Sequence, residues 1–251
     1  MSAAVASIGC TDPWNAAGLG LDIRALAACG IRPFTVVAGV TAQDAQGLTA
    51  AAAVTPELLA AQLASLRAAE IGAYRIGALL DRASVEIVAR HLRASGVPAV
   101  YDPVFAPSGG GRFASDDVVA AIRSELVPHV TLVTPNLIEA ATLTCAPVDD
   151  LAGMQRAARA LVAAGANAAL VKGGHLHDCA IDVLAHQGDV EIFEAPRIAG
   201  SLRGTGCLLA CGAAAALARG AALRDAIVAG RALVRDRFVH AETIAGMRVA
   251  Y

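Results

Sequence analysis

The stretch GSLRGTGCLLACGAAAALARG, residues 200–220, joins a tight glycine turn to a long apolar helix pattern. The pattern predicts a helix over residues 205–219, and a second helix is expected over residues 223–241. The most apolar part, residues 208–218, lies between Arg203 and Arg219 and is shorter than the ~20 residues that a membrane-spanning helix needs. The stretch therefore indicates a helix packed inside a globular protein.

Upstream of this stretch, strand patterns alternate with helix patterns. Short apolar runs end at residues 10, 43, 80, 104, 136 and 174, and helix patterns separate most of them. Such βαβ units predict a largely parallel central sheet covered by helices on both faces. The segment AIDVLAHQGDVEIFEAP, residues 180–196, is predicted to form a hairpin with Gly188 and Asp189 at its turn. Without a linker-like segment, residues 1–251 are expected to form a single α/β domain.

The composition narrows the classes of function. The chain has 251 residues, is 56% hydrophobic and has a net charge of −2, so nothing in it favours binding to nucleic acid. The first cation is Arg24, so the amino terminus lacks the pattern of a signal peptide, and a soluble, cytoplasmic protein without a membrane partner is expected. The six cysteines include no CxxC pair and are expected to be reduced thiols rather than metal ligands.

Polar motifs follow five of the predicted strands: CTDPWN, TAQD, DPV, TPN and KGGH. In sheets of this kind, ligands bind outside the carboxyl ends of the strands, which is where these motifs would meet. Any one of them is also explained as an ordinary turn. Five together favour a ligand site at this edge of the sheet.

The turn Gly204-Thr205-Gly206-Cys207 is the strongest candidate for a reactive site. Its glycines let backbone N–H groups converge, and the helix that follows adds unpaired N–H groups and the positive end of its dipole. Together they predict a site for a phosphate or a developing oxyanion. A thiol at a helix N-terminus is expected to have a lowered pKa, which would let Cys207 accept a proton from a substrate hydroxyl. The alternative is a plain turn in which Thr205 caps the helix and Cys207 is buried.

Four further residues suggest phosphate and cation chemistry. In TPNLIEA, Asn136 and Glu139 stand three residues apart at a predicted helix start, where they would equally form a capping arrangement. Glu139 and Asp102 of DPV could hold Mg²⁺, directly or through water. Lys172 is the only lysine and follows a predicted strand, where a compact ammonium suits nucleotide phosphates. Chance survival of one lysine among arginines is the alternative.

The order of these motifs resembles that of the hydroxymethylpyrimidine/phosphomethylpyrimidine kinases of thiamine biosynthesis, which belong to the ribokinase-like superfamily. The motifs are GCTDPWNAAGLGLD, TAQDAQG, YDPV, TPNLIEA, KGGH and GTGC, and the resemblance extends over about residues 8–239. It implies a ribokinase-like fold and phosphorylation of the hydroxymethyl group of 4-amino-5-hydroxymethyl-2-methylpyrimidine, with ATP and Mg²⁺. In bifunctional members the monophosphate is phosphorylated as well. The superfamily also makes a homodimer an expectation.

The resemblance assigns roles to particular residues. It makes Cys207 the base and part of an anion hole. It places Gln43 and Asp22 against the aminopyrimidine, since a carboxamide offers one acceptor and one donor to a planar edge. It assigns the N–H groups of the anion hole to three residues of the turn, Gly204, Thr205 and Gly206.

On the nucleotide side, the resemblance assigns Asp102 and Glu139 to Mg²⁺, and Lys172 and Asn136 to ATP. The chain departs from the family pattern in the loops at residues 14–17 and 105–111, and immediately before GTGC, where the usual Thr-His is Leu202-Arg203. Two alternatives stay open at this point. One is a vitamin B6 kinase acting on pyridoxal, and the other is a non-catalytic homologue that binds a pyrimidine.

Overall fold

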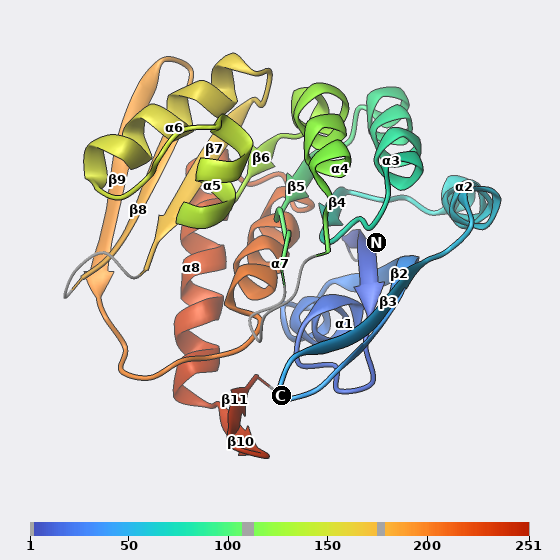
Figure 1. Cartoon of the computed structure of the whole chain (residues 1–251), viewed down its shortest axis with the longest axis horizontal. Helices are drawn as coiled ribbons and strands as arrows, with labels where there is room; N and C mark the ends of the chain where they lie inside the picture. The colour runs from blue at the N-terminus through green and yellow to red at the C-terminus, as the bar shows by residue number, and fades with distance from the viewer. Residues whose placement is uncertain (1–2, 107–112, 175–178, 251) are drawn as a thin grey trace.

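A computed structural model describes residues 3–106, 113–174 and 179–250 of the chain. One sheet of nine strands has the order β3-β2-β1-β4-β5-β6-β7-β8-β9 (Figure 1). The six strands from β2 to β7 in this order pair in parallel, whereas β3, β8 and β9 pair antiparallel. The strands are β1 Ala4–Thr11, β2 Arg32–Gln43, β3 Leu48–Ala53, β4 Ala73–Ile76, β5 Ala99–Tyr101, β6 Leu132–Val133, β7 Ala168–Gly173, β8 Cys179–His186 and β9 Asp189–Pro196.

Helices cover both faces of this sheet. Helices α2 to α6 pack on one face, and α1, α7 and α8 pack on the other, each around its own cluster of buried apolar side chains (Figure 1). The helices are α1 Gly18–Ala28, α2 Pro56–Ser65, α3 Arg82–Ser95, α4 Asp116–Ala121, α5 Leu137–Thr144, α6 Leu151–Ala163, α7 Thr205–Leu217 and α8 Leu223–Val239. The predicted α/β architecture is therefore confirmed.

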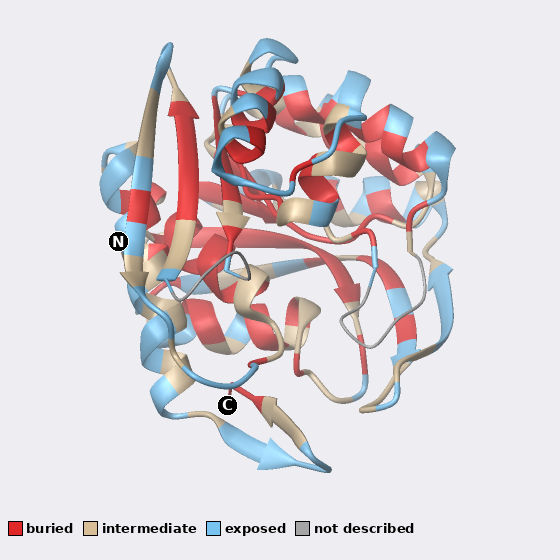
Figure 2. Cartoon of the chain, turned by 60° about the vertical axis from the view of Figure 1, so that its left-hand side comes forward, coloured by how far each residue is buried: buried red, intermediate tan, exposed pale blue. Residues whose placement is uncertain are grey.

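Burial explains why the strands have few polar residues. Seven of the eight residues of β1 are buried, as expected for a strand with helices on both sides. Figure 2 shows the same distinction across the molecule, with buried strands inside and exposed helix faces outside. Helix α7 is buried over most of its length and contacts α8 and α1, so its alanines and glycines allow a close approach of neighbouring backbones. Gly212, for example, leaves no room for a Cβ beside Gly230 of α8.

Four parts of the fold differ from the sequence-based prediction. The β8–β9 hairpin turns at Gln187 and Gly188, which both have positive φ, and Asp189 already belongs to β9. Two positive φ values are typical of the tight turn that matches the twist of a hairpin. The carboxyl-terminal hairpin, β10 Glu242–Ile244 and β11 Met247–Val249, was not predicted. Helix α7 ends two residues earlier than the apolar pattern indicated.

The fourth difference is an antiparallel arm at the edge of the sheet. Strand β2 continues to Gln43 and turns back into β3, which pairs with it from Leu48 to Ala53. The sequence LTAAAA has no strong strand preference, and most of β3 is exposed. Pairing with β2, rather than the local sequence, therefore makes this segment a strand. Within the described residues, no helix is long and apolar enough to cross a membrane.

Candidate active site

The turn before α7 has the geometry of an anion site. Gly204 is the N-cap residue and has φ 82°, a conformation that favours glycine. A Cβ there would lie 2.3 Å from Cδ2 of Leu21, so a larger residue would also clash. The first intrahelical bond is donated by the amide of Leu208 to the carbonyl of Gly204, at 2.9 Å. The amides of residues 205–207 precede it and have no intrahelical acceptor. Thr205 is the first helical residue and not the cap, so that part of the alternative is wrong.

The same turn lies against a carboxylate and an ammonium group from two other strand ends. Asp102 follows β5, and Lys172 lies near the end of β7. A Cβ built on Gly206 would be 2.9 Å from Oδ1 of Asp102 and 3.0 Å from Nζ of Lys172. The structure therefore brings Gly206, Asp102 and Lys172 together, as the strand-end argument predicted.

A methyl group at position 206 tests this close approach. The G206A variant is expected to displace the Asp102 carboxylate and the Lys172 ammonium, and to lower kcat/KM at least about tenfold, because small misplacements in a phosphoryl-transfer site are costly. Alanine suits a helical position, so the helix itself should be preserved, and any loss of unfolding free energy would come from the displaced ion pair. Steady-state kinetics and urea unfolding of the same preparation measure both effects. An unchanged kcat/KM would mean that the close approach has no catalytic consequence.

Asp102 is the centre of a buried network of charges. Its Oδ1 accepts hydrogen bonds from Lys172 Nζ at 2.8 Å and from Thr134 Oγ1 at 3.4 Å. Its Oδ2 lies 3.2 Å from Nη2 of Arg75. Burial alone would raise the pKa of Asp102, but Lys172 and Arg75 outweigh it and hold the pKa below its usual range. Asp102 is therefore ionised, and its charge is already balanced by two cations.

Arg75 is the important residue that the sequence analysis missed. It lies in β4, is 1% exposed, and its Nη1 forms a second ion pair with Oδ2 of Asp22 at 3.2 Å. Gly77 makes room for the guanidinium, since a Cβ there would be 2.2 Å from Nη1. The signal was a charged residue inside the apolar segment AYRI, where an arginine needs buried partners.

Asp22 does not face a substrate, which corrects the prediction made from the resemblance. The residue is 0% exposed, and its carboxylate is bonded to Arg75, to the Ser7 hydroxyl, and to the Cys211 thiol at 3.3 Å. Burial raises the pKa of Asp22 even though Arg75 acts against it. Asp22 therefore anchors Arg75 beneath the site.

Cys207 lies at the expected place, but its acidity differs from the expectation. The thiol is buried, and this burial raises its pKa to about 11, although Arg75 and an N–H of Gly18 act in the opposite direction. The prediction of a lowered pKa is wrong, because burial disfavours the thiolate more than Arg75 and the Gly18 N–H favour it. The group is a neutral thiol at pH 7.

Asn136 and Glu139 form the capping box of α5. The Glu139 amide donates to Oδ1 of Asn136 at 2.9 Å, and the Asn136 amide donates to Oε2 of Glu139 at 2.8 Å. Burial and the nearby Asp102 raise the pKa of Glu139 to about 7, against the effect of Lys172. The capping interpretation is thus confirmed, and it leaves Oε1 of Glu139 without a hydrogen bond to the described residues.

The donor set bears on the predicted magnesium site. Both oxygens of Asp102 already accept hydrogen bonds from cations, so a Mg²⁺ ion in direct contact would share Asp102 with Lys172 and Arg75. Oε1 of Glu139 is available to an ion or to its water. Among the described residues no three His, Cys, Asp or Glu side chains gather around a common point. These residues fit a Mg²⁺ ion that is held mainly by phosphates and water, with Glu139 at its edge.

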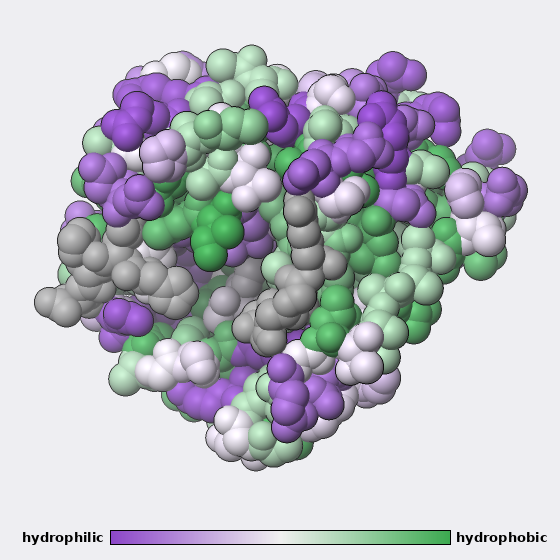
Figure 3. Space-filling model, viewed as in Figure 1, coloured by the Kyte–Doolittle hydropathy of each residue, from purple (hydrophilic) through white to green (hydrophobic). Residues whose placement is uncertain are grey.

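Gln43 lies at the tip of the β2–β3 arm and contacts the turn region through Arg203. Nη2 of Arg203 donates to Oε1 of Gln43 at 2.7 Å. Figure 3 shows apolar residues around the middle of the face seen in Figure 1, with hydrophilic residues along its upper edge and again at its lower edge. The predicted loop at residues 105–111 falls largely outside the described residues, and His175 of KGGH lies outside them as well.

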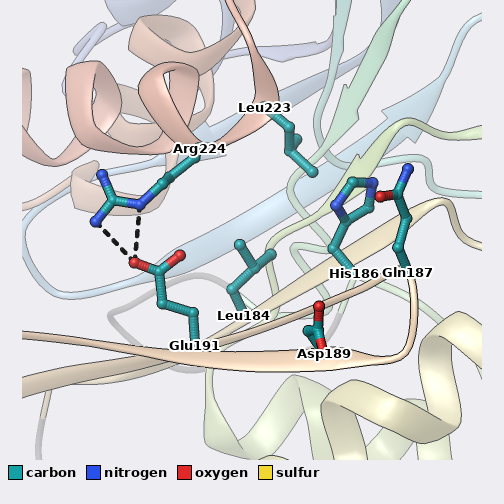
Figure 4. A pocket seen from close by; sticks show the side chains of 7 residues that line it. All are labelled: Leu184, His186, Gln187, Asp189, Glu191, Leu223 and Arg224. Carbon is teal, nitrogen blue, oxygen red and sulfur yellow. Dashed lines mark hydrogen bonds and ion pairs between the residues drawn. The ribbon is translucent and has the colours of Figure 1, made fainter.

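A separate small pocket lies between the β8–β9 hairpin and the start of α8. It has a volume of about 180 Å³, and an ion pair of 2.8 Å joins Arg224 to Glu191 beside it (Figure 4). None of the residues predicted for the site lines it. Its lining residues are Leu184, His186, Gln187, Asp189, Glu191, Leu223 and Arg224.

Comparison with known proteins gives consistent matches. The sequence model of the family described as phosphomethylpyrimidine kinase matches residues 12–248. A hydroxymethylpyrimidine/phosphomethylpyrimidine kinase of Rhizobium meliloti is 37% identical over 191 residues, which are 75% of this chain and 72% of that protein. The enzyme of the same name from Escherichia coli is 36% identical over 196 residues, 76% of this chain and 74% of that protein.

Solved structures show the same fold. A Bacillus subtilis pyridoxal kinase in complex with ADP superimposes with a TM-score of 0.91 at 24% identity, covering 99% of this chain and 97% of that one. A phosphomethylpyrimidine kinase from Clostridium difficile gives a TM-score of 0.83 at 21% identity, covering 94% of this chain and 99% of that one. At this level of identity the two structures establish the common fold and leave the substrate open.

Proposed function

The chain belongs to the phosphomethylpyrimidine kinase family, and on that premise we propose that it transfers the γ-phosphoryl group of ATP to the hydroxymethyl group of 4-amino-5-hydroxymethyl-2-methylpyrimidine, hydroxymethylpyrimidine below, in thiamine biosynthesis. The observation that carries the proposal is the N-terminus of α7 packed against the Lys172–Asp102 pair. Phosphoryl transfer needs little covalent chemistry from the protein and much positioning and charge stabilisation. The N-terminus of α7 and the Lys172–Asp102 pair can supply this positioning and charge stabilisation.

Each group has a defined part in this proposal. The amides of Thr205, Gly206 and Cys207 bind the oxygens of the phosphoryl group as charge develops on them. Lys172, held at 2.8 Å from Asp102, adds a positive charge at the same place. Mg²⁺ bound with ATP would neutralise phosphate charge, with Glu139 as its protein contact and Asn136 orienting Glu139 through the capping box.

Cys207 is the proposed acceptor of the hydroxyl proton. A thiol with a pKa of about 11 is protonated at neutral pH, so only a small thiolate fraction would act as base. A loose transition state tolerates this, because the nucleophilic oxygen loses its proton late.

Gln43 presents its carboxamide to the aminopyrimidine edge, as the resemblance implies. Phosphorylation of the monophosphate is part of the proposal.

An ADP-release assay with Mg²⁺-ATP tests the function. Hydroxymethylpyrimidine, its monophosphate and pyridoxal are offered separately, and kcat/KM for the free pyrimidine is expected to exceed that for pyridoxal at least about tenfold. Turnover of the monophosphate as well supports both steps. Turnover of pyridoxal alone would replace the proposal with a vitamin B6 kinase. Binding of the pyrimidine by a folded protein without any ADP release would leave a non-catalytic binding protein.

Two further parts of this proposal concern the protein in the cell. We propose that the protein acts in the cytoplasm, where ATP is available to small-molecule kinases. We also expect that it forms a homodimer. Sedimentation of the purified protein tests the second statement.

A further inference from the structure

Arg203 connects three segments that are far apart in the sequence. Its Nη2 donates to Oε1 of Gln43 at 2.7 Å, and its Nη1 donates to the backbone carbonyl of Asp44 at 3.0 Å. Nη1 also lies 3.2 Å from the sulfur of Met247 in β11. The Arg203 amide donates to the carbonyl of Arg248 at 3.0 Å, which ties the backbone to the carboxyl-terminal hairpin. Since Gly204 follows directly, the guanidinium joins the tip of the β2–β3 arm to the start of the anion turn.

These contacts fix which way the Gln43 carboxamide points. A guanidinium carries only hydrogen-bond donors, so the carbonyl oxygen of the amide must face it. A flipped amide would set its NH₂ group against the N–H groups of Arg203, donor against donor. The amide nitrogen of Gln43 has no hydrogen bond to any described residue. The oxygen has a second lone pair, so Gln43 can offer a ligand one acceptor on the Arg203 side and a donor beyond it.

We propose that Arg203 is a positioning residue that sets substrate specificity by locking the Gln43 carboxamide in this one orientation. The inference rests on the proposed function of the site. It assigns to the chain a preference for planar rings that carry a hydrogen-bond donor next to the hydroxymethyl group, followed by an acceptor.

The two candidate substrates differ in that respect. In hydroxymethylpyrimidine, the ring carbon next to the one that carries the hydroxymethyl group carries the amino group. The next ring atom is a nitrogen. With the hydroxymethyl group at the anion turn, the amino group meets the oxygen of Gln43 and the ring nitrogen meets its NH₂ group. Pyridoxal has an aldehyde oxygen in place of the amino group, so an acceptor would face an acceptor. A buried polar group left without its partner is the strongest basis that a site has for rejecting an analogue.

The test compares kcat/KM for hydroxymethylpyrimidine and pyridoxal in three variants and the wild type. R203M removes the donors and leaves the backbone contacts of residue 203 in place. Its ratio of the two kcat/KM values is expected to fall at least about tenfold, because the amide can then adopt both orientations. R203K keeps a donor-only group and is expected to restore part of the ratio. R248M is the control, because it removes an arginine of the carboxyl-terminal hairpin whose guanidinium donates to the carbonyls of Ala199 and Phe238 and not to Gln43. R248M should leave the ratio unchanged.

The ratio separates this inference from other effects of Arg203. A weaker anion turn or a weaker ATP site would reduce both kcat/KM values together and leave their ratio constant. A constant ratio in R203M, with the wild type active on the pyrimidine, overturns the inference and leaves the proposed function standing. A wild type without pyrimidine turnover overturns the proposed function first. Thermal unfolding of each variant verifies the fold, and R203K, the milder change, decides the question if R203M does not fold.

Discussion

The C207A variant is expected to have a kcat at least about a hundredfold below that of the wild type, with a nearly unchanged KM. A positioned proton acceptor typically contributes a factor of ~10²–10⁴, and it acts mainly in the transition state. The α7 amides and Lys172 remain in place, so ground-state binding should survive. Stopped-time assays with saturating Mg²⁺-ATP and varied pyrimidine measure both constants. C211A, which removes a thiol one turn further along α7, is the matched control and should change kcat only a few-fold.

The pH dependence sharpens this prediction. Burial raises the pKa of Cys207 to about 11, so below pH 11 the thiolate fraction grows about tenfold for each unit of pH. If the thiolate accepts the proton, kcat of the wild type should rise with pH through the neutral range. C207A should lack this rise above about pH 8, where Glu139, with a pKa of about 7, is already ionised in both proteins. An equal slope in both proteins, or an unchanged kcat in C207A, would remove the base role from Cys207.

The second large effect concerns stability. The R75M variant is expected to lose about 3–5 kcal/mol of unfolding free energy, because Asp22 is left as an uncompensated buried charge and Asp102 keeps only Lys172. The loss should shrink as the pH falls, since protonation of a buried carboxylate removes its charge. Urea unfolding at several pH values measures both the loss and its pH dependence.

Two variants serve as controls for R75M. R82M removes an arginine that is 47% exposed and paired with Glu86 and Asp117, and it should leave the unfolding free energy nearly unchanged, because solvent screens exposed ion pairs. The double variant D22N/R75M takes away one of the two buried charges and should recover part of the stability. A loss in R75M no greater than that in R82M would contradict the account of the buried network.

Periodicity and motif order in the sequence predicted the sheet, the helices on both faces and the cluster of strand ends. These features depend on local patterns, which repeat through the whole chain. The β3 strand depends on pairing with β2, and an alanine-rich segment gives no local sign of it. The turn of the β8–β9 hairpin was misplaced by one residue because Gln187 accepts a positive φ that a sequence pattern does not reveal.

The site was predictable to the extent that it depends on backbone topology. Asp102, Lys172 and Gly206 meet because strand ends and a helix N-terminus meet at one edge of the sheet. Burial could not be predicted in the same way. It turns Asp22 into a partner of Arg75, and it raises the pKa of Cys207 where a helix N-terminus alone would lower it. Both differences arise from neighbours that are distant in the sequence.

Phosphorus NMR of a single reaction tests the central claim most directly. The purified protein is incubated with Mg²⁺-ATP and hydroxymethylpyrimidine, and the spectrum is followed with time. The account predicts a phosphomonoester resonance that grows in proportion to ADP, at a rate that falls steeply in C207A and G206A. A folded protein that binds both compounds and forms no phosphomonoester, or that forms it equally well in both variants, would contradict the assignment of phosphoryl transfer to this turn.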